Sequence, residues 1–269
     1  MTFFLLFHVK QNKMFNSRYD VIVVGGGHAG AEAAASSANL GAKTLLVTMN
    51  LQTIGQMSCN PAMGGIAKGQ IVREIDAMGG YSGVVSDLTA IQFKMLNKSK
   101  GPAMWSPRVQ SDRAQFALKW RELLEKTPNL DFYQDMVVGL IVEKNKIEGV
   151  ITGLGNKIYS KSVILTNGTF LNGLIHVGDK NFGGGRVGEK SSTGITGRVG
   201  IGGSPLPSSL VVSSRESMMV WAWILESGLL GRVGFHRERL CHYLLLPWTV
   251  RRVQVMILVH LLDLFLKNE

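Results

Sequence analysis

Three glycine residues with a fixed spacing are the first group in this chain that could do chemistry. Gly25, Gly27 and Gly30 form a G-x-G-x-x-G pattern directly after the β-branched run 21–24. In a strand–turn–helix unit this pattern binds a dinucleotide, because glycine lets the backbone turn, the pyrophosphate approach and the helix pack on the sheet. The amides at the helix start, residues 28–31, would face the phosphates. We therefore predict a dinucleotide site here; a glycine-rich turn that binds nothing is the alternative.

Cys59 is the candidate nucleophile. It lies in the glycine-rich segment 51–70, which has neither helical nor strand periodicity, and the turn-favouring pair Asn60-Pro61 follows it. A loop of this length within a compact domain is usually functional. Lys68 would lower the pKa of a nearby thiol and favour the thiolate. The alternative is a small buried cysteine with no chemical role.

The residue that would choose between dinucleotides differs from the usual pattern. A carboxylate normally holds the ribose hydroxyls at the end of the second strand, and Thr48 occupies that position here. Asn50 could bind a ribose instead, more weakly. The fingerprint alone therefore does not distinguish FAD from NAD.

A regular order of elements must position these residues. Apolar runs predict strands at 21–24 and 44–47, and the helix between them would turn Ala34 and Ala38 toward the sheet. Further runs predict an antiparallel meander with a turn at Asn145-Lys146, and then a buried strand that leads into Asn167-Gly168-Thr169. The fold class is therefore α/β, a three-layer Rossmann-type domain with a parallel sheet and a β-meander crossover. The other predicted strands are 132–134, 137–143, 147–151 and 162–166, and the other predicted helices are 71–78 and 111–125.

Charge and composition bound the class of protein. The chain has 269 residues and a formal charge of +10, which favours a polyanionic partner. In the basic segment 91–121, lysine and arginine residues are set among Phe93, Trp105, Phe116 and Trp120. This mixture suits RNA, and a solvated loop followed by an amphipathic helix explains it equally well.

The cysteines and apolar runs predict a cytoplasmic protein with no membrane segment. Cys59 and Cys241 are too few for a disulfide framework or a four-cysteine metal site, and we expect no metal. The apolar run 2–7 is not a convincing signal peptide, and the run 253–266 is too short to span a bilayer. Met14 is an alternative start.

Several long motifs together resemble one family. The sequences GGGHAGAEAA (25–34), IGQMSCNPAMGGIAKG (54–69), LNKSKGPA (96–103), GTFLNGLIHVG (168–178) and GGGRVGEKSS (183–192) resemble the glucose-inhibited division protein A, or MnmG, family. These proteins are tRNA uridine 5-carboxymethylaminomethyl modification enzymes. The resemblance covers residues 19–196 almost without gaps.

The resemblance implies a cofactor set, partners and site residues. Family members form homodimers, bind FAD, reduce it with NADH, and modify carbon 5 of the wobble uridine of tRNA with the GTPase MnmE. Methylenetetrahydrofolate donates the one-carbon unit. By motif match Cys59 is catalytic, and a thiolate that adds to carbon 6 of uracil would make carbon 5 nucleophilic. The expected FAD-binding residues are Gly25, Gly26, Gly27, His28, Ala29, Gly30, Asn50, Val137, Gly168, Thr169 and Ser192.

The remainder of the chain departs from the family. Family members are more than twice this length, and their NADH-binding insertion, second catalytic cysteine and MnmE-docking domain lie beyond the matching region. From residue 197 on, seven of eight basic residues are arginine, against six of 21 before it. We expect residues 1–18 to be an extension, 19–196 a truncated FAD domain, and 197–269 an out-of-frame tail that forms no domain.

Two other functions stay open. A generic FAD-dependent oxidoreductase with a small-molecule substrate would carry the same fingerprint, although the S-C-N-P loop and the basic segment argue against it. A flavin-binding fragment with no turnover is the second alternative, favoured for a chain without the family's C-terminal half.

Overall fold

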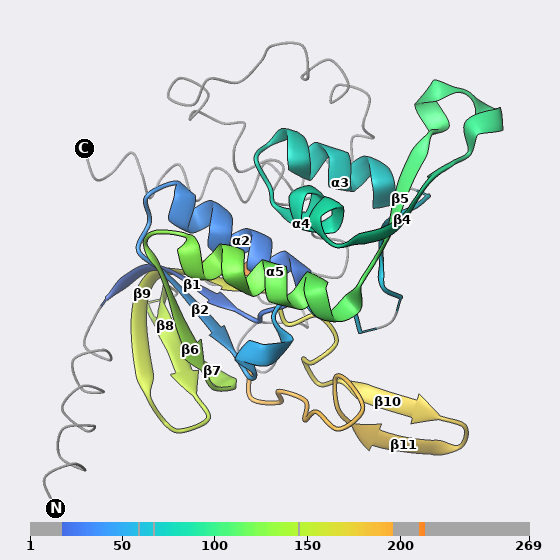
Figure 1. Ribbon diagram of the computed structural model, residues 1–269. Coiled ribbons are helices and arrows are strands. Elements are labelled where there is room, and N and C mark those ends of the chain that lie inside the picture. Colours follow the sequence, from blue (N-terminus) through green and yellow to red (C-terminus); the bar gives the residue numbers. More distant parts are fainter. Residues whose placement is uncertain (1–17, 59, 67, 145, 196–209, 213–269) are drawn as a thin grey trace, which may run out of the picture.

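The computed structural model describes residues 18–58, 60–66, 68–144, 146–195 and 210–212, and its main sheet follows the predicted order. Four parallel strands lie in the order β6-β2-β1-β9 (Figure 1). β8 pairs antiparallel with the first half of β9, β7 pairs antiparallel with β8, and β12 lies parallel to the second half of β9. The α/β parallel sheet with a meander crossover is thereby confirmed. The strands are β1 (Tyr19–Val24), β2 (Thr44–Thr48), β6 (Leu130–Gln134), β7 (Val137–Glu143), β8 (Lys146–Thr152), β9 (Lys157–Leu165) and β12 (Leu210–Val212).

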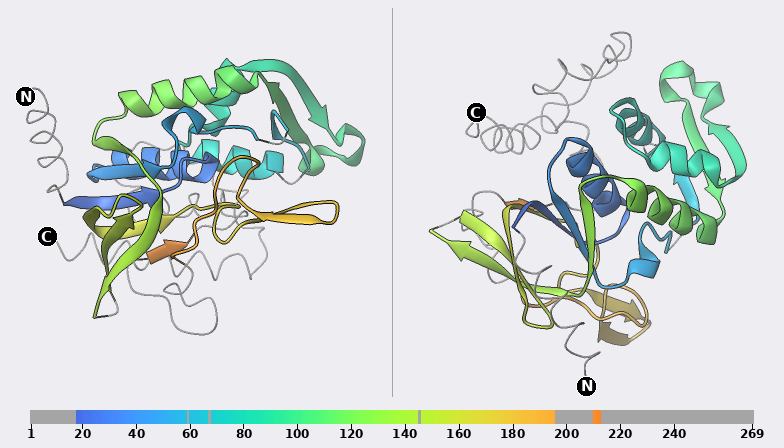
Figure 2. Two further views of the ribbon diagram at one scale, coloured as in Figure 1. Left: turned by 90° about the horizontal axis from the view of Figure 1, so that it is seen from below. Right: turned by 60° about the vertical axis from the view of Figure 1, so that its left-hand side comes forward.

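Alternation along β1 divides its side chains between two cores. Val21 and Val23 pack with α2 (His28–Asn39) and α5 (Arg113–Lys126), whereas Ile22 and Val24 pack with the meander. Figure 2 shows the helices and the meander on opposite faces of the parallel strands. These are the three predicted layers. They hold the carboxyl ends of β1, β2 and β9 at one edge of the sheet.

The helix α2 sits close to the strands because its inner face is made of small residues. Ala34 and Ala38 are buried, as predicted. The larger side chains that complete this core come from α5, where Phe116 and Trp120 are fully buried. The α5 helix begins after Asp112, whose carboxylate accepts hydrogen bonds from the backbone amides of Ala114 and Gln115, each at 2.9 Å.

The segment predicted as a long loop contains regular structure. Within 51–70 the structure has the 3₁₀ turn η1 (Leu51–Thr53), the strand β3 (Ala62–Gly64) and the start of α3 (Lys68–Ala77). The β3 strand was missed because three residues are too few to show a period. It becomes a strand only by pairing with β5 (Ser106–Ser111), which is distant in the sequence.

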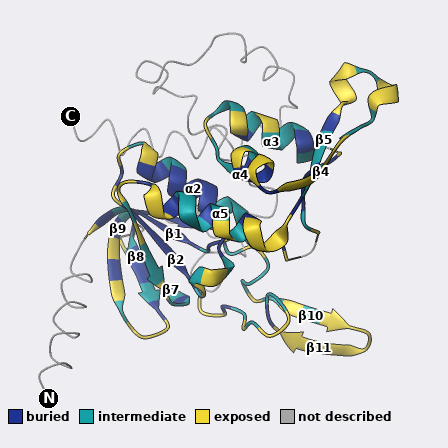
Figure 3. Ribbon diagram, viewed as in Figure 1, coloured by how far each residue is buried: buried dark blue, intermediate teal, exposed yellow. Residues whose placement is uncertain are grey.

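The first part of the basic segment 91–121 is a β-hairpin rather than a solvated loop, and its second part is the start of the predicted helix, α5. The strands β4 (Ala90–Leu96) and β5 are antiparallel and joined through the 3₁₀ turns η2 (Lys98–Lys100) and η3 (Pro102–Met104). We call residues 90–111 the arm, because Figure 1 shows it projecting away from the main sheet. β4 and the tip of the arm are largely exposed (Figure 3), so no buried face marked β4 in the sequence, and β5 buries only Ser106, Val109 and Ser111.

Two further elements were missed for related reasons. The helix α4 (Ser82–Leu88) is short, and it is held by the buried Glu32 of α2, whose carboxylate accepts the amides of Tyr81 and Ser82. The hairpin of β10 (Leu174–Val177) and β11 (Lys180–Gly183) is largely exposed on both faces. Asn145 and nearly all of the predicted tail lie outside the described residues.

Candidate dinucleotide site

A cavity of about 1110 Å³ opens where the carboxyl ends of β1, β2 and β9 meet. Its walls come from the glycine turn after β1, the segment after β2, the segment after β9 and the glycine-rich segment 185–192. A crevice outside the carboxyl ends of parallel strands is where Rossmann-type folds bind ligands. Of the residues predicted from sequence, those that line this cavity are Gly25, Gly26, Gly27, His28, Ala29, Asn50, Val137, Gly168, Thr169 and Ser192.

The three fingerprint glycines are needed for three different reasons. Gly25 has φ +107°, and a Cβ there would lie 2.6 Å from the Thr166 carbonyl oxygen. A Cβ on Gly30 would lie 1.8 Å from the carbonyl oxygen of Gly25, so only glycine lets α2 pack against the turn. Gly30 itself is buried and does not line the cavity. A Cβ on Gly27 would meet nothing within 4 Å, so the missing side chain at this position leaves open space beside the turn, on the cavity side.

The start of α2 is available to an anion. Gly27 is the N-cap and supplies no side-chain hydrogen bond, and the first turn holds no acidic residue. Free amides at a helix N-terminus attract phosphate groups. His28 does not add a positive charge at neutral pH, because burial and the Lys68 cation lower its pKa from 6.5 to about 4. Its ring packs against Phe116, with the centroids 5.6 Å apart.

Two hydroxyl groups tie the walls of the cavity together. Thr166 Oγ1 donates to the carbonyl oxygen of Val24, 2.8 Å away, and so joins the end of β9 to the end of β1. Ser192 Oγ donates to the carbonyl oxygen of Val137 at 2.8 Å. The hydroxyl of Ser192 thus holds the glycine-rich segment against the meander.

The two residues at the ribose position differ in exposure. Thr48 is buried, and its hydroxyl lies close under Gly26. The Oδ1 of Asn50 accepts a hydrogen bond of 2.8 Å from the Gln52 amide and caps η1. The cap does not use the side-chain amide nitrogen of Asn50, so this group is the one that could donate to a ligand.

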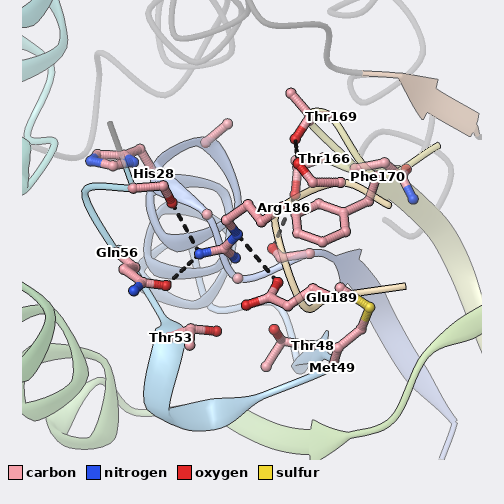
Figure 4. Close-up of a pocket in the computed structure, with 18 of the residues that line it drawn as sticks. His28, Thr48, Met49, Thr53, Gln56, Thr166, Thr169, Phe170, Arg186 and Glu189 are labelled. Carbon is pink, nitrogen blue, oxygen red and sulfur yellow. Dashed lines mark hydrogen bonds and ion pairs between the residues drawn. The ribbon is translucent and has the colours of Figure 1, made fainter. Parts of the chain in front are cut away.

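Sequence reasoning did not assign a role to Arg186, which lies inside the cavity (Figure 4). Its guanidinium donates to Gln56 Oε1 and to Ser58 Oγ, pairs with Glu189 at 3.2 Å, and stacks on the Phe170 ring. The side chain therefore links the glycine-rich segment to the segment that leads toward residue 59. A lone arginine within four glycines was the only signal in the sequence.

Cys59 lies outside the described residues, but its sequence neighbours do not. Ser58 and Asn60 line the cavity, and so does Lys68. Burial, and to a lesser degree the Arg108 guanidinium, lower the pKa of the Lys68 ammonium. The cation that we expected near the thiol is thus on the wall of the same cavity.

Comparison with known proteins accounts for this combination of fingerprint, cavity and glycine-rich segments. A family model described as glucose inhibited division protein A matches residues 20–203, a few residues beyond the predicted end of the resemblance. The chain belongs to the glucose-inhibited division protein A family. Two relatives, from Flavobacterium johnsoniae and Christiangramia forsetii, are 78% and 76% identical over 183 residues. Both are named tRNA uridine 5-carboxymethylaminomethyl modification enzyme MnmG.

A solved structure of the family has the same fold. The GidA of Aquifex aeolicus superposes with a TM-score of 0.65 at 52% identity, over 67% of this chain and 30% of that chain. The match to each of the two MnmG relatives covers 68% of this chain and 29% of the relative. The chain thus spans about three tenths of the length of the family members that it matches.

Two kinds of feature are absent from the described residues. None of the helices in the described ranges is both long and apolar enough to cross a membrane. In the same part of the chain, no three His, Cys, Asp or Glu side chains are grouped so that they could hold a metal ion.

Proposed function

We propose that this chain carries the FAD-binding part of a flavin-dependent enzyme that modifies carbon 5 of the wobble uridine in tRNA. The observation that carries the proposal is the uncapped start of α2, which opens through Gly27 into the cavity of about 1110 Å³. Its family relatives are named for the 5-carboxymethylaminomethyl modification of tRNA uridine.

The residues present fit FAD. The cavity volume lies slightly above the usual size range of small-molecule and cofactor sites, which leaves room for a ligand as large as FAD. The amides after Gly27 would hold the pyrophosphate, Asn50 the ribose, and the backbone at Gly168 and Thr169 the flavin side. Val137 and Ser192 would bound the cofactor from the opposite wall. FAD, when bound, supplies reversible hydride-transfer chemistry that no side chain can supply.

Positive side chains complete the match to a dinucleotide. Arg108, Arg186, Lys68 and Lys190 line the cavity, against the carboxylates of Asp135 and Glu189. An FAD diphosphate brings two negative charges to this surplus of cations. Arg186 lies inside the cavity, where its guanidinium already pairs with Glu189.

Cys59 is proposed as the catalytic thiol. A thiolate that adds to carbon 6 of uracil forms a carbon–sulfur bond and moves the ring's electron pair to carbon 5. Carbon 5 can then attack an electrophilic one-carbon group, and loss of the carbon 5 proton with expulsion of the thiolate restores the ring. Methylenetetrahydrofolate as carbon donor and NADH as reductant belong to the same proposal.

The partners proposed from the family are tRNA, the GTPase MnmE and a second copy of the chain, in the cytoplasm. Because the matched region spans only 29% of its relatives, we also propose that the described domain binds FAD without modifying tRNA by itself. Purified chain that modifies tRNA unaided would contradict this last point.

The test is FAD retention by Gly27→Val. The valine side chain has room in the fold but would occupy the place of the pyrophosphate, so affinity for FAD should fall by at least about 100-fold. Flavin fluorescence titration measures the affinity, and a urea melt checks the fold. A Gly27→Val protein that purifies with stoichiometric flavin would overturn the assignment.

Cys59→Ser is the matched control and also tests the thiol. It should keep FAD, because its role is chemical. In a full-length family enzyme with the S-C-N-P motif, the same change should abolish modified uridine, since a serine hydroxyl is hardly ionised at neutral pH. Normal levels of modified uridine by mass spectrometry of tRNA would exclude Cys59 as the nucleophile.

A further inference from the structure

The arm, residues 90–111, carries four cations and no acidic residue. Lys94, Lys98 and Lys100 are exposed, and Arg108 is half-buried at the base of the arm. Within the described residues, none of the four forms an ion pair with a carboxylate. A projecting element with one sign of charge attracts a polyanion.

The cations form a track that starts in the cavity wall. Arg108 lines the cavity, and its cross-strand partner on β4 is Lys94. Directly opposite residues of an antiparallel pair project on the same face, where like charges repel and destabilise the sheet. Lys68 of α3 adds a third positive charge close to Arg108. Within the described residues no carboxylate pairs with these three cations, although Lys68 Nζ donates to the Ala62 carbonyl oxygen at 3.3 Å, and a bound anion would relieve the repulsion.

The tip of the arm presents an aromatic ring in a fixed position. Trp105 is 39% exposed, and its indole N–H donates to the backbone carbonyl of Lys98 at 3.3 Å. The base of the tip is anchored through Ser106, whose hydroxyl accepts from Gln70 of α3 at 2.9 Å. An exposed ring that is already held in place can stack on an unpaired base at little entropic cost.

We propose that the arm is an RNA-binding surface for unpaired loop nucleotides. Lys94, Lys98 and Lys100 neutralise the backbone phosphates, and Trp105 stacks on an exposed base. The track from the tip to Arg108 leads the RNA toward the cavity. The proposal rests on the proposed function only for the identity of the RNA, since the wobble uridine lies in the unpaired anticodon loop of tRNA.

The experiment compares RNA affinity of the full chain and two matched triple variants. The first, Lys94→Ala/Lys98→Ala/Lys100→Ala, removes the arm charges. The control removes three exposed lysines outside the arm, Lys126→Ala/Lys157→Ala/Lys180→Ala. A third protein, Trp105→Ala, removes the ring. Fluorescence anisotropy with a 17-nucleotide anticodon stem-loop (about that size suffices) gives Kd over a range of salt concentrations.

The arm variant should bind at least about tenfold more weakly and lose about 2 units of salt-dependence slope, because each single-strand phosphate contact contributes about 0.7. Trp105→Ala should weaken stem-loop binding about 5- to 100-fold and hardly affect a blunt RNA duplex. The control should retain the original Kd and slope.

Three outcomes would overturn the proposal. Equal stem-loop affinity for the arm variant and the original chain places the RNA surface elsewhere while leaving the proposed function intact. No RNA binding by the original chain counts against the arm, whereas FAD binding by the same sample keeps the flavin assignment. A change of oligomeric state in the arm variant, with unchanged RNA affinity, makes the arm a contact between copies.

Discussion

The glycine turn at 25–30 and the arm at 90–111 border the same cavity but are built in opposite ways. The turn is determined by backbone geometry, because side chains at Gly25 and Gly30 would overlap carbonyl oxygens. The arm is determined by side-chain character, and its backbone is an ordinary exposed hairpin. Substitution at Gly25 or Gly30 should therefore destabilise the fold, whereas substitution of the arm lysines should leave the fold intact and alter binding.

The largest expected effect separates two glycines of the same turn. Gly30→Ala places a methyl group 1.8 Å from a carbonyl oxygen and should destabilise the fold by about 3 kcal/mol or more. Gly27→Ala, with open space around it, should cost less than about 1 kcal/mol. Urea unfolding followed by tryptophan fluorescence measures both. Equal losses would mean that the close packing of α2 on the turn does not limit stability.

The next effect is a pH dependence that originates beside the same turn. The pKa of His28 is about 4 in the folded protein, below its ordinary 6.5, so the unfolded chain takes up the proton first as pH falls. The stability due to the neutral ring is complete above pH 6.5 and is lost as pH falls toward 4, by up to about 3 kcal/mol.

His28→Gln should lack that part of the pH dependence. The quantity to measure is the difference in unfolding free energy between the two proteins at pH 7.5 and at pH 4.5. A difference that does not change between these values would mean that the ring of His28 titrates normally in the folded protein.

The smallest expected effect is a substitution in the arm that raises the stability of the fold rather than lowering it. Lys94→Glu turns the repulsive cross-strand pair with Arg108 into an attractive one, and should stabilise the protein by about 0.2 to 1 kcal/mol. The same variant should bind RNA more weakly. A variant that is both less stable and normal in RNA binding would make Lys94 a structural residue.

The sequence allowed good prediction of the turn and poor prediction of the arm for one physical reason. Glycine spacing and β-branched runs encode local geometry directly, so β1, α2 and β2 could be named in advance, and ten of the eleven predicted cofactor residues line the cavity. The hairpin β4–β5 has no buried face over most of its length, hence no period. Its composition indicated RNA, but only the structure places Lys94 opposite Arg108.

Residues that act through distant contacts were also beyond sequence reasoning. Arg186 reaches Gln56 and Ser58, 130 and 128 positions earlier in the chain. Glu32 stabilises α4 by accepting amide hydrogen bonds about 50 positions away. Such partners are set by the packing of the whole sheet, whereas motifs describe neighbours along the chain.

The hydrogen bond from Thr166 to Val24 has a consequence for how the protein is made. It joins two residues 142 positions apart, across the parallel pair of β1 and β9. Contacts of such wide separation form late, because the intervening chain must be synthesised and ordered first. At about 5 to 20 residues per second, a ribosome needs several seconds to complete that stretch. During this time the glycine turn has no β9 beside it, so the proposed flavin site is complete only after the strand emerges.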